Sequence, residues 1–261
     1  MISYESVILE VKGKVAVLKL NAPDVLNALS GEMVRELSVA VSEATHTEQV
    51  RCLLLTGVGR GFCAGANLQG SASSESAEPA GSVLETHYAP LMNKLRNLPF
   101  PMVTAVNGVA AGVGMSLALV GDIVIAAESA YFLQAFAKIG LVPDGGATWY
   151  LPRLIGWGRA MELSLLAERL PASKALDWGL VNSVSPDIDL AEAGMAMAIR
   201  LADGPMSLGL IRKAYWASWE NDFNKQIQLE SDLQNQAQQS ADSREGVAAF
   251  LEKRAAQFKG Q

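Results

Sequence analysis

A long stretch of the chain, from Asn97 to Gly121, carries no charged side chain. A helix of that length could cross a bilayer. However, Pro99, Pro101 and several glycines interrupt the stretch, and no belt of aromatic residues flanks it. Strands and helices that are buried on all sides also read as continuous apolar runs. We therefore expect a buried strand, turn and helix here, and no association with a membrane.

Glycines mark the turn inside this stretch. Gly108, Gly112 and Gly114 have no Cβ, which allows another segment to approach their backbone closely. The apolar residues from Ser116 to Val120 predict a helix after the turn. The first N–H groups of a helix have no partner within it and lie at its positive end. A backbone donor near Val113 is therefore well placed to stabilise an oxyanion.

Predicted strands and helices alternate over most of the chain. Short apolar runs predict strands, and apolar residues at helical spacing predict helices. We expect strands at Val7–Val11, Val15–Leu20, Arg51–Thr56, Val103–Val106 and near Val184, and helices after Ser30, from Leu84 to Leu95, at Ala160–Leu170, after Pro171 and from Leu190 onward. This order predicts an α/β core over residues 1–200, followed by a C-terminal helical region over residues 201–261.

The composition of one further segment and the residue spacing of another predict local structure. Gln69–Ser82 is rich in Ser, Ala, Gly and Glu, a composition that cannot pack a core, so we expect a mobile loop. Near the C-terminus, Glu245 follows Asp242 by three residues, ahead of the apolar residues Val247–Leu251. This spacing predicts a capping box at the start of the last helix.

The composition excludes several classes of function. The net charge is -6 over 261 residues, whereas a nucleic-acid-binding surface needs a basic stripe. The two cysteines, Cys52 and Cys63, do not make a disulfide framework, and free thiols fit a reducing compartment. The first residues have neither the basic region nor the long apolar region of a secretory signal. We therefore expect a cytoplasmic protein that binds no nucleic acid.

Short motifs of known chemistry are absent or incomplete. The glycines from Gly57 to Gly61 follow a predicted strand, but the spacing and the helix of a dinucleotide-binding motif are missing. The sequence contains no phosphate-binding loop, no zinc-protease motif and no nucleophile elbow. His46 and His87 are too few for a histidine-based metal site, so we expect no metal. No histidine lies near Ser116 in the sequence, which favours a packing role over a nucleophilic one.

Asp144 is the only carboxylate between Glu128 and Glu162, in otherwise apolar surroundings. Within the tetrapeptide Pro143–Gly146 it favours a turn, because Asp side chains bond to nearby backbone groups. The bare pattern therefore favours a structural role for Asp144 and leaves a chemical role open.

Three blocks of the sequence, in this order, resemble the crotonase family, also called the enoyl-CoA hydratase/isomerase superfamily. They are GFCAGANL at Gly61–Leu68, AVNGVAAGVGMSLA at Ala105–Ala118 and LVPDGGATWYLPRLIG at Leu141–Gly156. The resemblance extends from Asn21–Leu29 to Ser243–Phe258. It implies an α/β fold, a crotonase-type spiral of ββα units, with a C-terminal helical region that assembles homotrimers or hexamers. It also implies an acyl-CoA thioester as substrate, and no separate cofactor, because coenzyme A is part of the substrate.

The resemblance also implies which residues form the site. Two backbone N–H groups stabilise a thioester enolate in this family, and their positions correspond here to Ala66 and Val113. Positions of the acyl-CoA cleft correspond to Asp24, Val25, Ala28, Ala64, Asn67, Leu68, Gly112, Ser116 and Phe136, and Phe258 resembles the aromatic residue that often covers the adenine.

The chain departs from the hydratases of this family at two positions. Two glutamates position and activate water in those enzymes, and here Ser116 and Phe136 stand in their places. Water addition needs an acid and a base around one water, which these two side chains cannot supply. Asp144 remains, at a position where some isomerases and a dehalogenase of the superfamily carry an aspartate.

The pattern AFAKIGLVPDGG is especially similar to that of the isomerases of bacterial phenylacetate degradation, which act on a ring-epoxide aryl-CoA. In this interpretation, Asp144 takes the C2 proton while the N–H groups of Ala66 and Val113 hold the enolate. The same carboxyl returns the proton at C4. Burial beside Phe136 should raise the pKa of Asp144, which suits a group that holds and releases a proton.

Three alternatives stay open. Asp144 could attack an aryl carbon, as in a dehalogenase, with His87 as a helper base. It could instead hold a water alone and support a residual hydratase activity. Finally, the chain could be an acyl-CoA-binding protein without catalysis, because one fold hosts unrelated functions.

Overall fold

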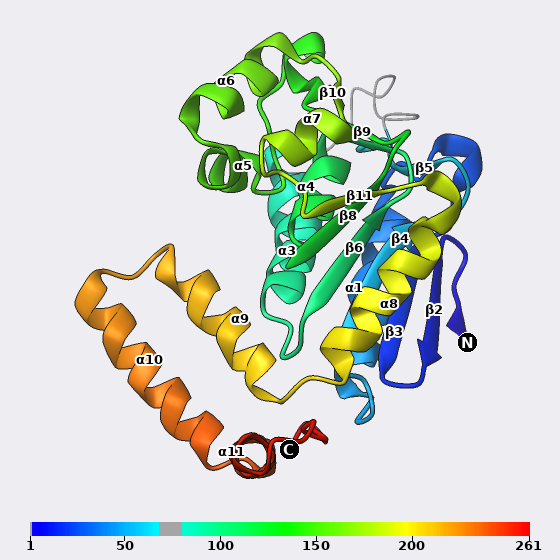
Figure 1. The fold of residues 1–261 in the computed structure, drawn as a ribbon. Coiled ribbons are helices and arrows are strands. Elements are labelled where there is room, and N and C mark those ends of the chain that lie inside the picture. Colours follow the sequence, from blue (N-terminus) through cyan, green and yellow to red (C-terminus); the bar gives the residue numbers. More distant parts are fainter. Residues whose placement is uncertain (1, 68–79) are drawn as a thin grey trace.

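Two β-sheets form the centre of the molecule. The computed structural model describes residues 2–67 and 80–261 (Figure 1). Among these residues, the larger sheet has seven strands in the order β1-β2-β3-β4-β6-β8-β11. Their bounds are β1 Ile2–Ser3, β2 Val7–Lys12, β3 Val15–Leu20, β4 Cys52–Gly57, β6 Met102–Val106, β8 Ile123–Ala127 and β11 Ser183–Ser185. The first two pairs are antiparallel and the remaining pairs are parallel.

A smaller sheet has the strand order β10-β9-β7-β5. Three of its strands, β5, β7 and β9, each follow a strand of the larger sheet along the chain. Its described strands are β5 Gly61–Cys63, β7 Val109–Ala111, β9 Tyr131–Leu133 and β10 Leu170–Pro171. In the successive pairs β4/β5, β6/β7 and β8/β9, the first strand joins the larger sheet and the second joins the smaller one. A helical segment follows each pair. The predicted α/β fold, a spiral of ββα units, is confirmed.

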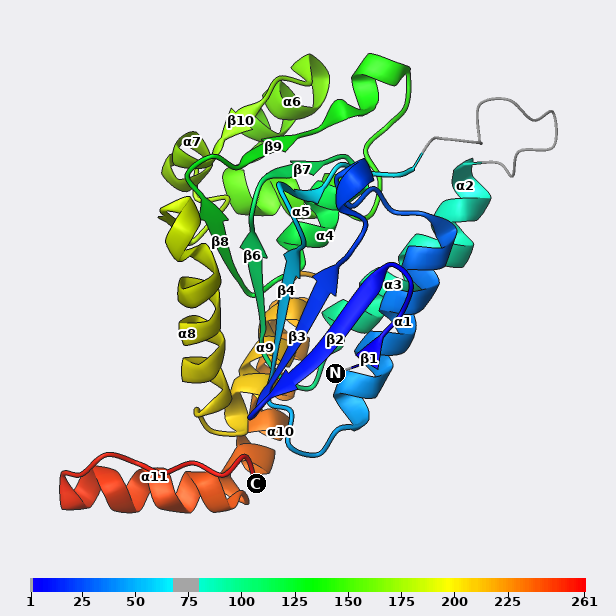
Figure 2. The same ribbon diagram turned by 90° about the vertical axis from the view of Figure 1, so that its right-hand side faces the viewer.

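Helices cover both faces of the larger sheet (Figure 2). α1 (Gly31–His46) and α3 (Ala89–Arg96) lie on one side, and α8 (Leu190–Ala202) lies on the other. The apolar face of α1 is buried, as its helical spacing predicts. The Ser30 side chain caps this helix by accepting a hydrogen bond from the Met33 N–H at 3.1 Å.

The uncharged stretch supplies the innermost strands and helix. β6, β7 and the following helix α4 (Val113–Leu119) are buried at every residue. Their continuous apolar character therefore reflects burial within the protein. In the part of the chain that the structure describes, no helix is both long and apolar enough to cross a membrane.

The remaining helical segments are mostly in the second half of the chain. They are η1 Pro23–Val25, α2 Ala80–Val83, the π-helix η2 Leu84–Tyr88, η3 Ala135–Ile139, α5 Ala147–Ile155, α6 Trp157–Leu166, α7 Ala172–Asp177, η4 Asp187–Asp189, α9 Ser207–Ser218, α10 Phe223–Gln238 and α11 Ala241–Glu252. The predicted end of one helix and the predicted end of the mobile loop are wrong. α6 ends at Leu166 because Leu170 pairs with Phe132 in the smaller sheet, and residues 80–82 are helical. The rest of the predicted loop, residues 69–79, lies outside the described residues.

Three helices, α9 to α11, extend from the body of the molecule (Figure 1). Arg212 attaches α9 to that body. Its buried guanidinium donates to the Asp122 carboxylate at 2.7 Å and to the Leu95 carbonyl oxygen at 2.7 Å. Asp122 also accepts the Met102 N–H at 2.7 Å, where β6 begins. The predicted division into two domains at residue 200 falls near the end of α8, at Ala202, and stays a prediction.

The start of α11 differs from the prediction. Ser240 caps the helix and accepts a backbone N–H at 2.9 Å, so the predicted capping box of Asp242 and Glu245 is wrong. The Asp242 carboxylate instead accepts the backbone N–H groups of Lys259 and Gly260, at 2.7 and 2.8 Å. It thereby holds the C-terminal tail against α11, and local spacing does not reveal such a contact.

Candidate active site

Asp144 lies in a tight turn that packs against α4. The two residues after it, Gly145 and Gly146, have φ angles of +59° and +89°, a conformation that glycine adopts at little cost. A Cβ on Gly145 would lie 2.9 Å from the Cβ of Ser116 and 3.0 Å from Cγ2 of Val113. The glycine pair therefore lets the turn lie directly against the beginning of α4.

Ser116 holds this turn in place. The residue is fully buried, and its hydroxyl donates a hydrogen bond to the backbone carbonyl oxygen of Asp144 at 2.8 Å. The same carbonyl oxygen accepts the Ala147 N–H at 3.0 Å, where α5 begins. Ser116 thus positions Asp144 through the backbone, which agrees with a packing role. Contact of Ser116 with a substrate stays a prediction.

The side chain of Asp144 is half-buried, and one of its carboxylate oxygens is unpaired. Its Oδ1 is sealed from solvent and has no hydrogen-bond partner among residues 2–67 and 80–261. Burial raises the pKa of Asp144 from 3.8 to about 6, because a poorly hydrated environment disfavours the charged form. The direction is the one that the sequence predicts. A carboxyl group with such a pKa can take up and release a proton near neutral pH.

The N–H of Val113 is available because of its place in the helix. Val113 is the first residue of α4, so its N–H has no acceptor within the helix. None of the described residues accepts it from elsewhere. Gly112, which precedes it, has a φ of +52°. The donor therefore stays open at the positive end of α4.

The N–H of Ala66 is available for a different reason. Ala66 forms a parallel bridge with Leu29, in which the Leu29 N–H donates to Gly65 and the Asn67 N–H donates to Leu29. In such a bridge, the polar groups of the central residue point away from the partner. The Ala66 N–H therefore points away from Leu29, and no residue that the structure describes accepts it.

Close backbone contacts bring these groups together. A Cβ on Gly112 would lie 3.9 Å from the Cα of Gly65 and 3.6 Å from Cζ of Phe136. The two segments that carry the donors are therefore in contact, with the buried Phe136 ring beside them. The side chain of Val113 in turn touches the turn of Asp144. The two donors, the aromatic ring and the carboxylate thus belong to one site.

The early loop runs beside the first donor. Asp24 and Val25 belong to η1, and Asp24 is exposed. Ala28 directly precedes the residue that bridges Ala66, and the Ala64 N–H donates to the same loop at 3.0 Å. The structure therefore brings these predicted cleft residues to one edge of the site, together with Asn67. Their contact with coenzyme A stays a prediction, and Leu68 lies outside the described residues.

Asn27 is a positioning residue that the sequence did not single out. Its fully buried side chain accepts the Ala22 N–H at 2.8 Å and donates to the carbonyl oxygens of Val58, at 3.0 Å, and Gly61, at 2.8 Å. It ties the early loop to the segment that leads into β5. An Asn in a loop reads as an ordinary turn residue, so only these contacts identify it.

Other reactive side chains near the site have different surroundings. Cys63 is fully buried and its pKa is raised to about 12 by burial, so the thiol is unreactive. His87, considered above as a helper base, has its Nδ1 2.7 Å from the hydroxyl oxygen of Thr86. Within the described ranges, no group of three or more His, Cys, Asp or Glu side chains could hold a metal ion.

Within a single chain, Phe258 lies far from the candidate active site. Its Cε1 is 3.4 Å from a Cβ built on Gly246 of α11, so the ring packs on that helix. α11 and the C-terminus are at the opposite end of the molecule from β5 and β9 (Figures 1 and 2). Within a single chain, Phe258 is therefore not part of the predicted cleft, because the tail is held to α11.

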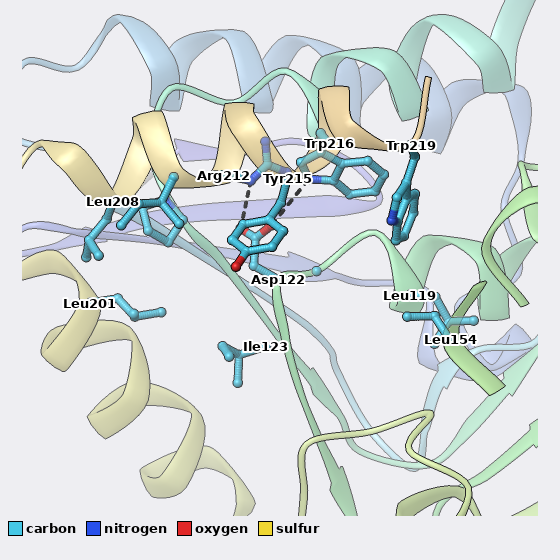
Figure 3. A pocket seen from close by; sticks show the side chains of 13 residues that line it. Leu119, Asp122, Ile123, Leu154, Leu201, Leu208, Arg212, Tyr215, Trp216 and Trp219 are labelled. Atoms are coloured by element: carbon cyan, nitrogen blue, oxygen red, sulfur yellow. Dashed lines mark hydrogen bonds and ion pairs between the residues drawn. The ribbon is translucent and has the colours of Figure 1, made fainter. Parts of the chain in front are cut away.

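An apolar pocket lies at a different place, between α8, α9 and the start of β8 (Figure 3). Arg212 and Trp216 donate to the Asp122 carboxylate at its wall, at 2.7 and 3.4 Å. The labelled residues that line it are Leu119, Asp122, Ile123, Leu154, Leu201, Leu208, Arg212, Tyr215, Trp216 and Trp219. None of the predicted site residues lines this pocket, so we assign it no role in the acyl chemistry.

Comparison with known proteins places this geometry in a family. Residues 10–261 match the family described as enoyl-CoA hydratase/isomerase. The chain belongs to this enzyme family. It is 46% identical to the 1,2-epoxyphenylacetyl-CoA isomerase of Escherichia coli, over 98% of this chain and 99% of that protein. It is 44% identical to a "probable enoyl-CoA hydratase" of Rhodobacter capsulatus, over 99% of this chain and 100% of that protein.

Solved structures agree with this assignment. An enoyl-CoA hydratase subunit from Geobacillus kaustophilus superposes with a TM-score of 0.92 at 36% identity, over 99% of both chains. The resemblance stated from the sequence motifs is therefore confirmed, together with the enzyme class and the fold. An isomerase and hydratases are both found among these relatives, so identity by itself leaves the reaction open.

The change Asp144→Asn should stabilise the protein in a pH-dependent way. The native pKa of about 6 lies above the ordinary value of 3.8, so the folded state binds the proton more tightly. The wild type therefore loses stability as pH rises from about 4 to about 6, and the neutral amide avoids this loss. In urea unfolding, the advantage of the variant should be largest at pH 8 and vanish near pH 4. An equal advantage at both values would contradict the burial of an ionised carboxylate.

The change Val113→Pro removes one N–H and keeps a backbone that suits the first residue of a helix. Loss of one oxyanion donor costs about 3–4 kcal/mol, so acyl-CoA turnover should fall about 10²- to 10³-fold. Val113→Ala truncates the side chain and keeps the N–H, so it is the matched control and should retain most of the turnover. If Val113→Pro and Val113→Ala both fold and have equal kcat values, Val113 is excluded as an oxyanion donor.

Proposed function

We propose that this protein is an acyl-CoA isomerase that moves a proton on an enoyl-CoA or on a ring-epoxide aryl-CoA. One observation carries the proposal: Asp144 is half-buried, its Oδ1 is sealed from solvent without a partner, and its pKa is raised. Its turn packs against the helix whose first N–H is open. A proton acceptor beside oxyanion donors is what the formation of a thioester enolate requires.

In the proposed reaction, Asp144 removes a proton from C2 of the acyl group. The electron pair of the C–H bond moves toward the thioester oxygen, where the N–H groups of Ala66 and Val113 stabilise the enolate. The protonated carboxyl then returns the proton at C4, and the double bond moves from the 3,4 to the 2,3 position. With a ring epoxide, the corresponding shift of electrons opens the ring system to an oxepin.

The comparisons support isomerisation of an aryl-CoA more than hydration. The relative from Escherichia coli is named for a ring-epoxide substrate. The hydroxyl of Ser116 is taken up by the Asp144 carbonyl oxygen, and Phe136 has no acid–base group. The relative named "probable enoyl-CoA hydratase" keeps hydration as the second candidate.

A dehalogenase reaction would need a base that helps Asp144 attack an aryl carbon. His87 contacts the hydroxyl of its neighbour Thr86 and, among the described residues, forms no hydrogen bond with Asp144. Nothing in the geometry therefore favours this reaction over proton transfer.

We also propose a homotrimer or hexamer in the cytoplasm. The C-terminal helices expose apolar side chains that a single chain leaves uncovered, and such a surface favours self-association. These side chains are Ile211, Tyr215, Phe223, Ile227, Val247, Phe250 and Leu251. Assembly would also give Phe258 a route to an acyl-CoA bound to another copy. The two free, buried cysteines fit a reducing compartment.

Conversion of a 3-enoyl-CoA to the conjugated 2-enoyl-CoA tests the proposed function. The wild type should form this product, followed by its absorbance, and should hydrate crotonyl-CoA far more slowly. Asp144→Asn should lower the isomerisation rate by about 10²- to 10⁴-fold, the range of an acid–base catalyst. Asp177→Asn changes an exposed carboxylate and is the matched control, which should keep the wild-type rate.

Three outcomes would reject the proposal. Full turnover by Asp144→Asn would mean that another group carries the proton. Hydration of crotonyl-CoA that outpaces isomerisation in the wild type would favour the hydratase candidate. Tight binding of acyl-CoA without either reaction would favour a non-catalytic binding protein.

A further inference from the structure

Tyr88 ends the π-helix η2, between α2 and α3. It is buried, whereas Glu85 and Thr86 of the same turn are exposed, so the Tyr88 ring lies on the core side of the segment. The wide turn closes with a hydrogen bond from the Ala89 N–H to the Leu84 carbonyl oxygen. Single π-turns are rare and are found frequently at functional sites. The location of Tyr88 therefore makes it a candidate for a role in the site.

The Tyr88 hydroxyl lies within electrostatic reach of two parts of the site. Its pKa is raised to about 12, first by burial and then by the nearby Asp144 and Cys63. Cys63 ends β5, directly before the loop of the first oxyanion donor, and Asp144 is the candidate base. The hydroxyl thus lies near both the donor loop and the carboxylate. With this pKa it stays protonated at neutral pH and can donate a hydrogen bond.

This donor has no partner in the part of the chain that the structure describes. The Tyr88 oxygen is not among the sealed polar atoms, which include Oδ1 of Asp144, so it keeps some contact with solvent. Burial accounts for the raised pKa of Asp144, and no hydrogen bond from Tyr88 opposes it. Without a partner among the described residues, this hydroxyl of a buried side chain is left to the little water that reaches it. An acceptor atom of a ligand would give it a partner.

We propose that the Tyr88 hydroxyl donates a hydrogen bond to an oxygen atom on the acyl group, so that the site selects oxygen-bearing aryl-CoA thioesters over hydrocarbon ones. This inference rests on the proposed acyl-CoA function. The thioester oxygen is held by the N–H groups of Ala66 and Val113, so the acceptor of Tyr88 is a second oxygen. Because Asp144 acts at C2, this oxygen lies close to C2, as a ring epoxide on an arylacetyl group does.

Equilibrium binding of two stable thioesters tests the inference. Phenylacetyl-CoA and (2-hydroxyphenyl)acetyl-CoA differ by one oxygen on the ring carbon next to the side chain. A neutral hydrogen bond changes affinity by about two- to tenfold, and the wild type should prefer the hydroxylated ligand by that factor. Tyr88→Phe keeps the ring and should reduce the preference to about one. Tyr4→Phe removes a hydroxyl that bonds Glu43 at 2.6 Å, and this control should keep the wild-type preference.

A wild type without the preference, or an unchanged preference in Tyr88→Phe, would overturn the inference. The wild-type ratio needs no variant, so a poorly folded Tyr88→Phe would still leave a decisive measurement. The result is separable from the isomerase test, because the binding preference needs no turnover and the isomerisation of a 3-enoyl-CoA needs no second oxygen. The two proposals can also fail separately. If Tyr88→Phe abolishes the binding preference but the wild type transfers no proton, the role of Tyr88 stands and the isomerase function is rejected.

Discussion

The site depends on the partial burial of one carboxylate, Asp144, whose sealed Oδ1 has no partner among the described residues. A charge in this position costs free energy of folding, and the pKa of the group rises as a consequence. The fold holds the residue through its backbone, because Ser116 bonds its carbonyl oxygen and α5 begins three residues later. The same partial burial that lowers stability brings the pKa of the group near neutral pH, where it can take up and release a proton, and such shifted pKa values are common at catalytic sites.

The spiral of ββα units brings the other groups to this carboxylate. β5 and β7 pair in parallel in the smaller sheet, so the loops that follow them leave at the same edge. One loop carries the N–H of Ala66 and the other carries that of Val113. Gly65 and Gly112 let the two loops touch, and Gly114 lies against β5 where a Cβ has no space. Two open backbone donors and the candidate base are thus assembled by backbone contacts between successive turns of the spiral.

Local patterns in the sequence predict much of the fold and part of the site. Apolar periodicity is sufficient to predict the strands and α1, and the glycine turn identifies the start of α4. Family resemblance suggests the role that we propose for Asp144. Contacts between distant segments are not predictable in this way. The hydrogen bond from Ser116 to Asp144 spans 28 residues. His87 is the more obvious acid–base residue in the sequence, yet it is its neighbour Tyr88 that is buried, with its hydroxyl within reach of the charge of Asp144.

Hydrogen exchange at C2 of phenylacetyl-CoA in deuterated water isolates the central step, because this thioester has no side-chain double bond to move. The C2 proton signal is followed by NMR for the wild type and for Asp144→Asn. Exchange by the wild type should increase as pH rises through about 6, where Asp144 becomes ionised, and should be lost in the variant. Exchange that persists in Asp144→Asn, or a wild type that binds the thioester without exchanging its proton, would contradict the assignment of Asp144 as the base.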